Sequence, residues 1–268
     1  MVTNDFETRY EWLRPAQLIE RKKECPLVIM PLGPLEYHGP HLPLGTDALN
    51  ATAVAHACCR KLGKGVVMPT LFAGTERERD PQLVEALGFK PGSYIVGMDF
   101  PSRLWNSHYF PEEVFALMVA AELDILVGQG YHDLFIVNGH GATNHGEVLR
   151  RLCVVYRNTR GVRIDFCLSY PQDIFDAGLG GHADIVETSM LAHYRPESVD
   201  LDTLPPQEIP IHYQDFSIVD GPGFSPHYDR DHVVRTDPRE ATAERGKAWF
   251  DQVVNETVTK IENFLKQG

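Results

Sequence analysis

Short apolar runs alternate along the chain with longer segments in which apolar residues recur at helical spacing. The runs of strand length lie at residues 26–31, 65–70, 133–138 and 162–168. The helical patterns lie at residues 48–62, 111–127, 144–157, 185–194 and 240–265. Strands that alternate with helices predict an α/β fold with a mostly parallel central sheet.

Two segments depart from this alternation. Residues 72–110 are rich in charge, proline, glycine and aromatic side chains, and residues 195–238 contain seven prolines. Segments of this length without regular structure usually serve function or assembly in a compact fold. No stretch has the composition of a linker, so we expect a single domain over residues 1–268.

Composition and charge narrow the class of protein. The chain has 268 residues, of which 43% are hydrophobic and 23% charged, which is typical of a globular protein. The net charge of −12 argues against nucleic acid and anionic membranes as partners. The start of the chain lacks the pattern of a signal peptide, and the most apolar stretch, 114–127, is too short to span a bilayer. We therefore expect a cytoplasmic protein whose five cysteines are reduced, mostly buried thiols.

The candidate chemistry begins directly after the first predicted strand. Glu36, His38, His41 and Asp47 follow it within a segment rich in glycine and proline. Ligands bind at the carboxyl ends of strands in open parallel sheets, and carboxylates and imidazoles are ligands of Zn, Mn and Fe. Glu36 and His38 are two residues apart, so in extended backbone they point the same way.

Two further segments add candidates. His140 lies between two glycines after the predicted strand 133–138, at a second strand end. His182, Asp184 and Glu187 lie at the start of a predicted helix. Structural roles compete here, because Asp and Glu also favour helix starts, where they cap the first turn and complement its dipole. For His41 a supporting role is the stronger interpretation.

Other catalytic templates are missing from the sequence. It has no Gly-x-Ser-x-Gly nucleophile elbow, no Walker loop and no Gly-x-Gly-x-x-Gly dinucleotide fingerprint. Metal chemistry remains the best-supported class.

Three motifs resemble those of the creatininase (creatinine amidohydrolase) family. They are Pro31-Leu-Gly-Pro-Leu-Glu-Tyr-His-Gly-Pro-His-Leu-Pro-Leu-Gly-Thr-Asp47, Asn138-Gly-His-Gly141 and His182-Ala-Asp-Ile-Val-Glu-Thr-Ser189. The order of strands and helices fits over roughly residues 20–195. The resemblance implies a three-layer α/β/α sandwich with a dinuclear metal site, hydrolysis of amide bonds in small cyclic or formamide substrates, and a homo-oligomer, commonly a hexamer.

The resemblance also implies roles for single residues. Glu36, Asp47 and His140 would hold one divalent ion (Zn, Mn or Fe), and His38 with Asp47 a second, so that Asp47 bridges. His182 would transfer a proton. Creatininase completes its second site with a glutamate two residues after the Asn-Gly-His histidine. That position is Ala142 here, so either Glu187 or water replaces it, or the second metal ion binds weakly.

The substrate is less closely defined. None of the three tryptophans matches those that surround the substrate in creatininase. Residues 74–81 and 97–108 instead resemble the 3-dehydro-scyllo-inosose hydrolases, which cleave a carbon–carbon bond of a carbocyclic diketone in inositol catabolism. The charged side chains of this region would suit a polyhydroxylated substrate, or would form salt bridges between subunits: Arg77, Arg79, Asp99 and Arg103.

Both substrates imply one mechanism, in which activated water attacks a carbonyl carbon. His182 then passes a proton to the leaving nitrogen or carbon, and Glu187 is the second catalytic candidate. The alternative from another class is a non-catalytic protein that binds a metal or small ligand on the same fold. His182 together with Glu187 discriminates between them, because a binding protein needs no proton shuttle.

Overall fold

The computed structural model of the protein describes residues 6–176, 180–209, 211, 216–219 and 237–266. Its centre is a sheet in which every strand pairs in parallel with its neighbours. The strands run in the order β2 (Val66–Val67), β1 (Leu27–Gly33), β4 (Asp133–Asn138) and β5 (Arg163–Leu168), and β3 (Leu71–Phe72) also pairs with β1. The predicted parallel sheet is confirmed.

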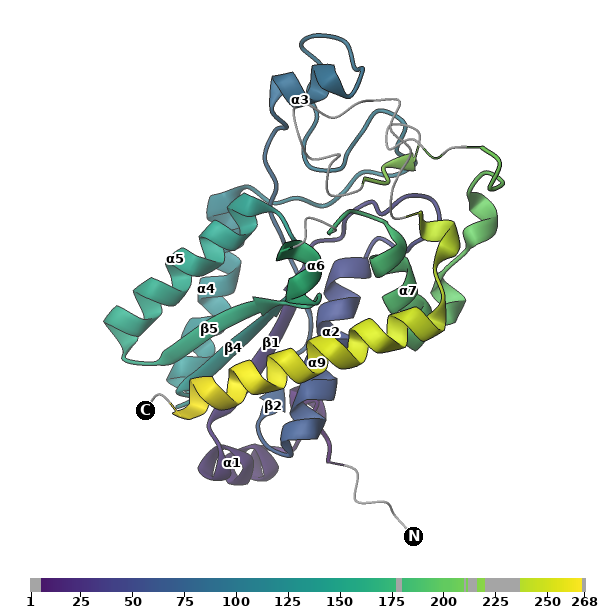
Figure 1. The fold of residues 1–268 in the computed structure, drawn as a ribbon. Helices are drawn as coiled ribbons and strands as arrows, with labels where there is room; N and C mark the ends of the chain where they lie inside the picture. Colours follow the sequence, from purple (N-terminus) through teal and green to yellow (C-terminus); the bar gives the residue numbers. More distant parts are fainter. Residues whose placement is uncertain (1–5, 177–179, 210, 212–215, 220–236, 267–268) are drawn as a thin grey trace.

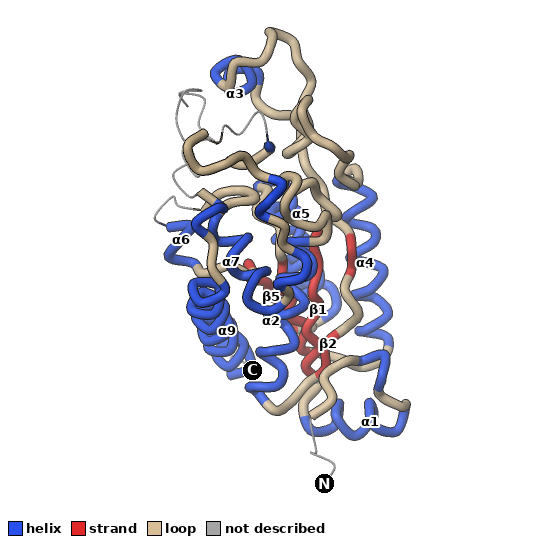
Figure 2. The backbone as a smooth tube through the Cα atoms, turned by 90° about the vertical axis from the view of Figure 1, so that its right-hand side faces the viewer, coloured by secondary structure: helices blue, strands red, loops and turns tan. Residues whose placement is uncertain are grey.

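Helices cover both faces of this sheet. One face packs against α4 (Glu112–Gly128) and α5 (Thr143–Arg160). The other packs against α2 (Thr46–Leu62), α7 (Ile185–Tyr194) and α9 (Ala243–Lys266). Figure 2 shows the strands edge-on between α4 on one side and α2 and α9 on the other. The fold is therefore the expected three-layer α/β/α sandwich.

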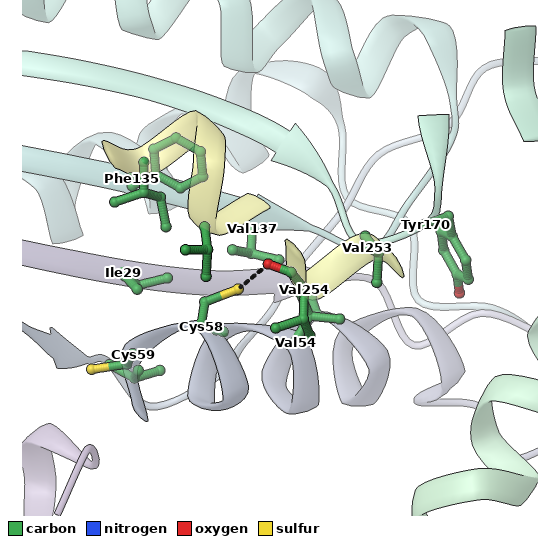
Figure 3. Packing of buried hydrophobic residues seen from close by; sticks show 14 of the residues in the cluster. Ile29, Val54, Cys58, Cys59, Phe135, Val137, Tyr170, Val253 and Val254 are labelled. Atoms are coloured by element: carbon green, nitrogen blue, oxygen red, sulfur yellow. Dashed lines mark hydrogen bonds between the residues drawn. The ribbon is translucent and has the colours of Figure 1, made fainter. Parts of the chain in front are cut away.

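The alternation of side chains along β1 divides the core into two layers. All seven residues of β1 are buried, as expected for a parallel strand covered on both faces. Leu27 and Ile29 pack toward α2 and α9, whereas Val28 and Met30 pack toward α4 and α5. Figure 3 shows the first layer, where α2 and α9 lie close enough for the Cys58 thiol to reach the Val254 carbonyl at 3.7 Å. All five cysteines are free, and all except Cys167 are buried.

The boundaries differ from the sequence-based predictions where local chemistry intervenes. The strand expected at 65–70 is two short pieces, β2 and β3, and Pro69 between them has no N–H to continue a ladder. Helix α1 (Pro15–Glu24) was not predicted, because none of its residues is buried and only Leu18 packs against the core. Helix α2 ends at Gly63, as expected, in the left-handed conformation with φ 64°.

Residues 73–110, which we call the excursion, lie beyond the carboxyl ends of the strands, at the top of Figure 1. The excursion contains α3 (Pro81–Ala86) and a small apolar core of its own. The second irregular segment is described only in part. Its described portion includes the short turns η2 (Pro196–Ser198) and η3 (Leu201–Thr203), and residues 210, 212–215 and 220–236 lie outside the described residues.

The remaining short elements are η1 (Tyr10–Trp12), α6 (Gln172–Asp176) and η5 (Pro238–Glu240). Within the described ranges, no helix combines the length and the apolar character that crossing a bilayer requires.

Candidate metal centre

The ends of two neighbouring strands bring the first group of candidates together. Leu32 of β1 pairs with Asn138 of β4, so the loops that follow these strands begin side by side. Glu36 and His38 lie on the first loop, Asp47 lies in the first turn of α2, and His140 follows β4. All four side chains are at least 95% buried and form one cluster, as the sequence predicts.

Glycine at position 139 allows this convergence. A Cβ atom at Gly139 would lie 2.0 Å from the backbone oxygen of Asp47, which is far inside van der Waals contact. Only glycine therefore lets the start of α2 rest directly on the end of β4. The side chain of Asn138 then braces the turn, because its amide donates to the His140 carbonyl at 2.7 Å and its oxygen accepts from the His140 N–H at 3.0 Å.

Asp47 lies between two imidazoles. Its Oδ1 is 3.1 Å from Nε2 of His38, and its Oδ2 is 3.0 Å from Nδ1 of His140. Glu36 joins the same group, with Oε2 at 3.1 Å from Nδ1 of His140 and 3.9 Å from Nε2 of His38. Asp47 thus has one oxygen toward each imidazole, as expected of a carboxylate that two metal positions would share.

The backbone fixes which nitrogen of His38 faces the carboxylates. Its Nδ1 lies 3.0 Å from the carbonyl of Glu36, to which it donates. Nε2 is thereby left as the atom that can accept a metal ion. A second hydrogen bond that sets the tautomer is typical of metal-ligating histidines.

The start of α7 supplies the third part of the cluster. Asp184 caps the helix by accepting from the N–H groups of Val186 at 2.9 Å and Glu187 at 3.1 Å, as the structural interpretation predicts. Glu187 accepts from the N–H of Ala183 at 2.6 Å, and its Oε2 lies 3.5 Å from Nε2 of His38. Ala183 itself has φ 52°, a costly conformation for a residue other than glycine.

His182 lies against the same cluster. Its backbone pairs with Val219 in an isolated bridge, and its Nε2 donates to the Tyr37 carbonyl at 2.8 Å. The ring lies 4.3 Å from that of His38, centroid to centroid. Because Nε2 is the donor, Nδ1 is left as the acceptor.

The buried charges set the protonation of these groups. Burial alone would lower the pKa of His38, but the carboxylates of Glu187 and Asp47 outweigh it and raise this pKa to about 10. The pKa of His140 is raised in the same way by Glu36 and Asp47. Burial and the neighbouring His38 lower the pKa of His182 to about 3, so His182 is a neutral base. Burial raises the pKa of Glu187.

The donor set fits a divalent cation. In the described part of the chain, no lysine or arginine forms an ion pair with Glu36, Asp47 or Glu187, although all three carboxylates are buried. Buried carboxylates without such partners are costly unless they bind cations. The candidate ligand atoms lie within 4.8 Å of one another in three overlapping groups: Glu36–Asp47–His140, His38–Asp47–Glu187 and Glu36–His38–His182.

A cavity of about 460 Å³ opens onto this cluster. Glu36, Asp47, His140, His182 and Glu187 line it, together with residues 76–80 of the excursion. A volume of this size suits a small molecule. Ala142 also lines the cavity, but a methyl group cannot bind a metal ion.

The charged residues expected to bind substrate divide into two pairs. Arg77 and Arg79 line the cavity; Arg77 contacts Glu112 and Glu147, whereas Arg79 donates to the carbonyl of Gly97. Asp99 and Arg103 are not among the cavity-lining residues, because Asp99 accepts from Ser107 and Arg103 donates to the carbonyls of residues 99 and 100. The structure therefore does not bring this second pair to the site.

Two further residues support the cluster. His41 is nine-tenths buried or more, and its Nε2 contacts the Thr188 hydroxyl at 3.0 Å, which agrees with the supporting role predicted for it. Tyr109 was not predicted. Its hydroxyl donates to Oε1 of Glu36, although it lies 73 positions away in sequence and no motif marks it.

Comparison with known proteins decides the family. A family model described as creatinine amidohydrolase matches residues 12–261, nearly the whole chain. The chain belongs to the creatininase family. Creatininase-family members are metal-dependent hydrolases, so the chain is a hydrolase with a divalent metal cofactor, as predicted.

The similar proteins carry names that differ in substrate, and the solved structures among them share the fold. A mycofactocin precursor peptide peptidase of Mycobacterium ulcerans is 30% identical over 243 residues, which cover 88% of this chain and 84% of that protein. A 3-dehydro-scyllo-inosose hydrolase of Thermotoga maritima is 37% identical over only 63 residues, 24% of this chain and 20% of its own. A solved manganese creatininase has a TM-score of 0.66 at 20% identity, covering 96% of this chain and 99% of its own.

Proposed function

We propose that this creatininase-family protein hydrolyses an amide-type carbon–nitrogen bond of a small, polar, cyclic substrate. The observation that carries the proposal is the position of Asp47 between His38 and His140, at a cavity that His182 also lines. Carboxylate, imidazole and a neutral base thus converge on one space that admits a small molecule.

Two sets of residues would hold the metal ions. Glu36, Asp47 and His140 form one position, and His38, Asp47 and Glu187 form the other. Glu187 takes the place that Ala142 cannot fill. Divalent ions bound there supply Lewis acidity, which polarises a carbonyl group and lowers the pKa of water toward ~7.

The protein's own base is His182. Its Nε2 is held by the Tyr37 carbonyl, so Nδ1 is free to accept a proton from attacking water. Burial and the neighbouring His38 lower the pKa of His182, so the imidazole is neutral and would accept the water proton before donating it to the leaving nitrogen. Arg77 and Arg79 at the cavity wall would bind polar groups of the substrate.

A second candidate is hydrolysis of a carbon–carbon bond in a polyhydroxylated cyclic diketone. The local likeness to the Thermotoga maritima hydrolase and the charged wall formed by residues 76–80 favour it. The attack on a carbonyl carbon is the same in both reactions, and only the leaving atom differs. The cytoplasmic location and the homo-oligomer remain predictions.

The test is a substrate panel for the protein loaded with Zn²⁺ or Mn²⁺, using cyclic amides, formamides, short peptides and polyhydroxylated cyclic diketones. We expect turnover of a cyclic amide, with kcat lowered about 10²–10⁴-fold in His182→Gln and metal content unchanged. His132→Gln, on an exposed loop, is the matched control. Turnover of the diketone alone would select the second candidate. No turnover by fully loaded protein would favour a binding protein.

A further inference from the structure

We propose that Tyr109 is a positioning residue for the metal centre: it holds Oε1 of Glu36 and thereby directs Oε2 to the metal. This inference rests on the proposed function, because it needs Glu36 to be a ligand. Tyr109 belongs to the excursion and not to any of the three motifs that carry the other candidates.

The two oxygens of Glu36 have different partners. Oε1 accepts from the Tyr109 hydroxyl, whereas Oε2 faces Nδ1 of His140 at 3.1 Å. A hydrogen bond to one oxygen restricts rotation of the carboxylate and leaves the other oxygen as the better-placed ligand for a metal ion. Tyr109 therefore orients Glu36 and favours Oε2 as its ligand atom.

Tyr109 is itself held in place by residues 97 and 98. Its hydroxyl accepts from the N–H of Met98 at 3.2 Å, so the hydroxyl proton is left to point at Glu36. The ring packs on Gly97, where a Cβ atom would lie 2.5 Å from the hydroxyl oxygen. Glycine at position 97 therefore leaves room for the tyrosine in this orientation.

The neighbours of Tyr109 hold the neighbours of Glu36. The N–H of His108 donates to the Leu35 carbonyl at 2.7 Å. The Ser107 hydroxyl accepts from the N–H of Tyr37 at 2.9 Å and donates to Asp99 at 2.7 Å.

Residues 107–109 of the excursion thus hydrogen-bond with residues 35–37, the segment that has Glu36 at its centre. A tyrosine that merely satisfied its hydroxyl would not need the neighbouring contacts of residues 107 and 108 as well. The arrangement makes the excursion a support for the metal centre as well as a wall of the cavity. It also gives Asp99 a purpose away from substrate, because Asp99 anchors Ser107.

The test measures metal affinity, with Zn²⁺ in competition with a chelator, for the wild type and Tyr109→Phe. Loss of a residue that orients a ligand typically costs 10–100-fold, so we expect the affinity for one of the two ions to fall by about that factor. Tyr156→Phe is the matched control, because its buried hydroxyl donates to the Ala120 carbonyl at 2.8 Å, away from the site. We expect it to bind Zn²⁺ as the wild type does.

A second readout is the visible spectrum of the protein loaded with Co²⁺, which reports the coordination number of the ion. Freed from Tyr109, Glu36 can offer both oxygens, so the spectrum of Tyr109→Phe should change while that of Tyr156→Phe should not. Unchanged affinity and spectrum in Tyr109→Phe would overturn the inference and leave the proposed function intact. Equal losses in both variants would reduce Tyr109 to a structural residue and overturn it too.

Two further outcomes are decisive. A wild-type protein that binds no Zn²⁺ would refute the proposed function, and the inference with it. If Tyr109→Phe does not fold, Ser107→Ala is measured instead. This variant removes the hydroxyl that binds the N–H of Tyr37, next to Glu36. Wild-type affinity in folded Ser107→Ala would then count against the proposal.

Discussion

The two sides of the metal centre are built in different ways. On the sheet side, Glu36, Asp47 and His140 are fixed by the pairing of β1 with β4 and by the direct contact of α2 with Gly139. On the helix side, His38 meets Glu187, which comes from the start of α7. The sheet side depends on main-chain packing, whereas the helix side depends on the docking of a separate element. The difference predicts a tighter and a weaker metal position.

Substitution of Asp47, the residue that both metal positions share, should have the largest effect. Asp47 contacts an imidazole on each side, so Asp47→Ala should abolish both metal binding and activity. Elemental analysis and the substrate panel measure the two losses. The control is Asp165→Ala, which changes an aspartate of β5 that lies near Lys260. This variant should retain both metal binding and activity. Full activity in metal-stripped Asp47→Ala would contradict the assignment.

A change confined to the helix side should separate the two positions. Glu187→Gln removes one charged ligand of the second position, and we expect the affinity for that ion to fall by at least about 100-fold. The sheet side should keep its ion, so the metal content should fall from two ions toward one. The exposed Glu197→Gln serves as the control. Loss of both ions together would show that the positions are not independent.

The smallest expected effect is on the way in which the stability of the metal-free protein depends on pH. The pKa of His38 is raised to about 10 from 6.5, so its contribution to stability is complete below about pH 6.5 and is lost as the pH rises toward 10. The pKa of His182 is lowered to about 3, so its contribution is present above about pH 6.5 and is lost as the pH falls.

The melting temperature of metal-free protein should therefore be highest near neutral pH. It should fall on the alkaline side more than that of Zn²⁺-loaded protein, because the metal replaces the proton on His38. Thermal unfolding with and without Zn²⁺ measures this difference. Parallel alkaline falls in the two samples would argue against His38 as a ligand.

The sheet side could be predicted from sequence because its residues follow strands. Periodicity predicts β1 and β4, and strand ends in a parallel sheet lie together, so the sequence predicts that Glu36 and His140 meet, as they do. Helices that bury an apolar face, such as α2 and α9, were also found. Helix α1 was missed because all its residues are at least partly exposed, and propensity alone marks such helices poorly.

The rest of the site depends on contacts that leave no periodic trace. The register between residues 107–109 and 35–37 joins segments about 70 residues apart. Charge alone suggested Asp99 and Arg103 as substrate contacts, but the structure turns both toward their own loop. Sequence revealed which residues could do chemistry, and only the fold separated those that reach the cavity from those that support it.

The support of Glu36 by Tyr109 has a consequence for altering what the protein acts on. The cavity wall at residues 76–80 and the brace at residues 107–109 belong to the same excursion, yet they contact different parts of the site. A library randomised over the wall could therefore diversify specificity while preserving the catalytic metal. A library that also randomised residues 107–109 would consist mostly of variants that have lost the metal. Variants with a new specificity would then be rare among inactive clones.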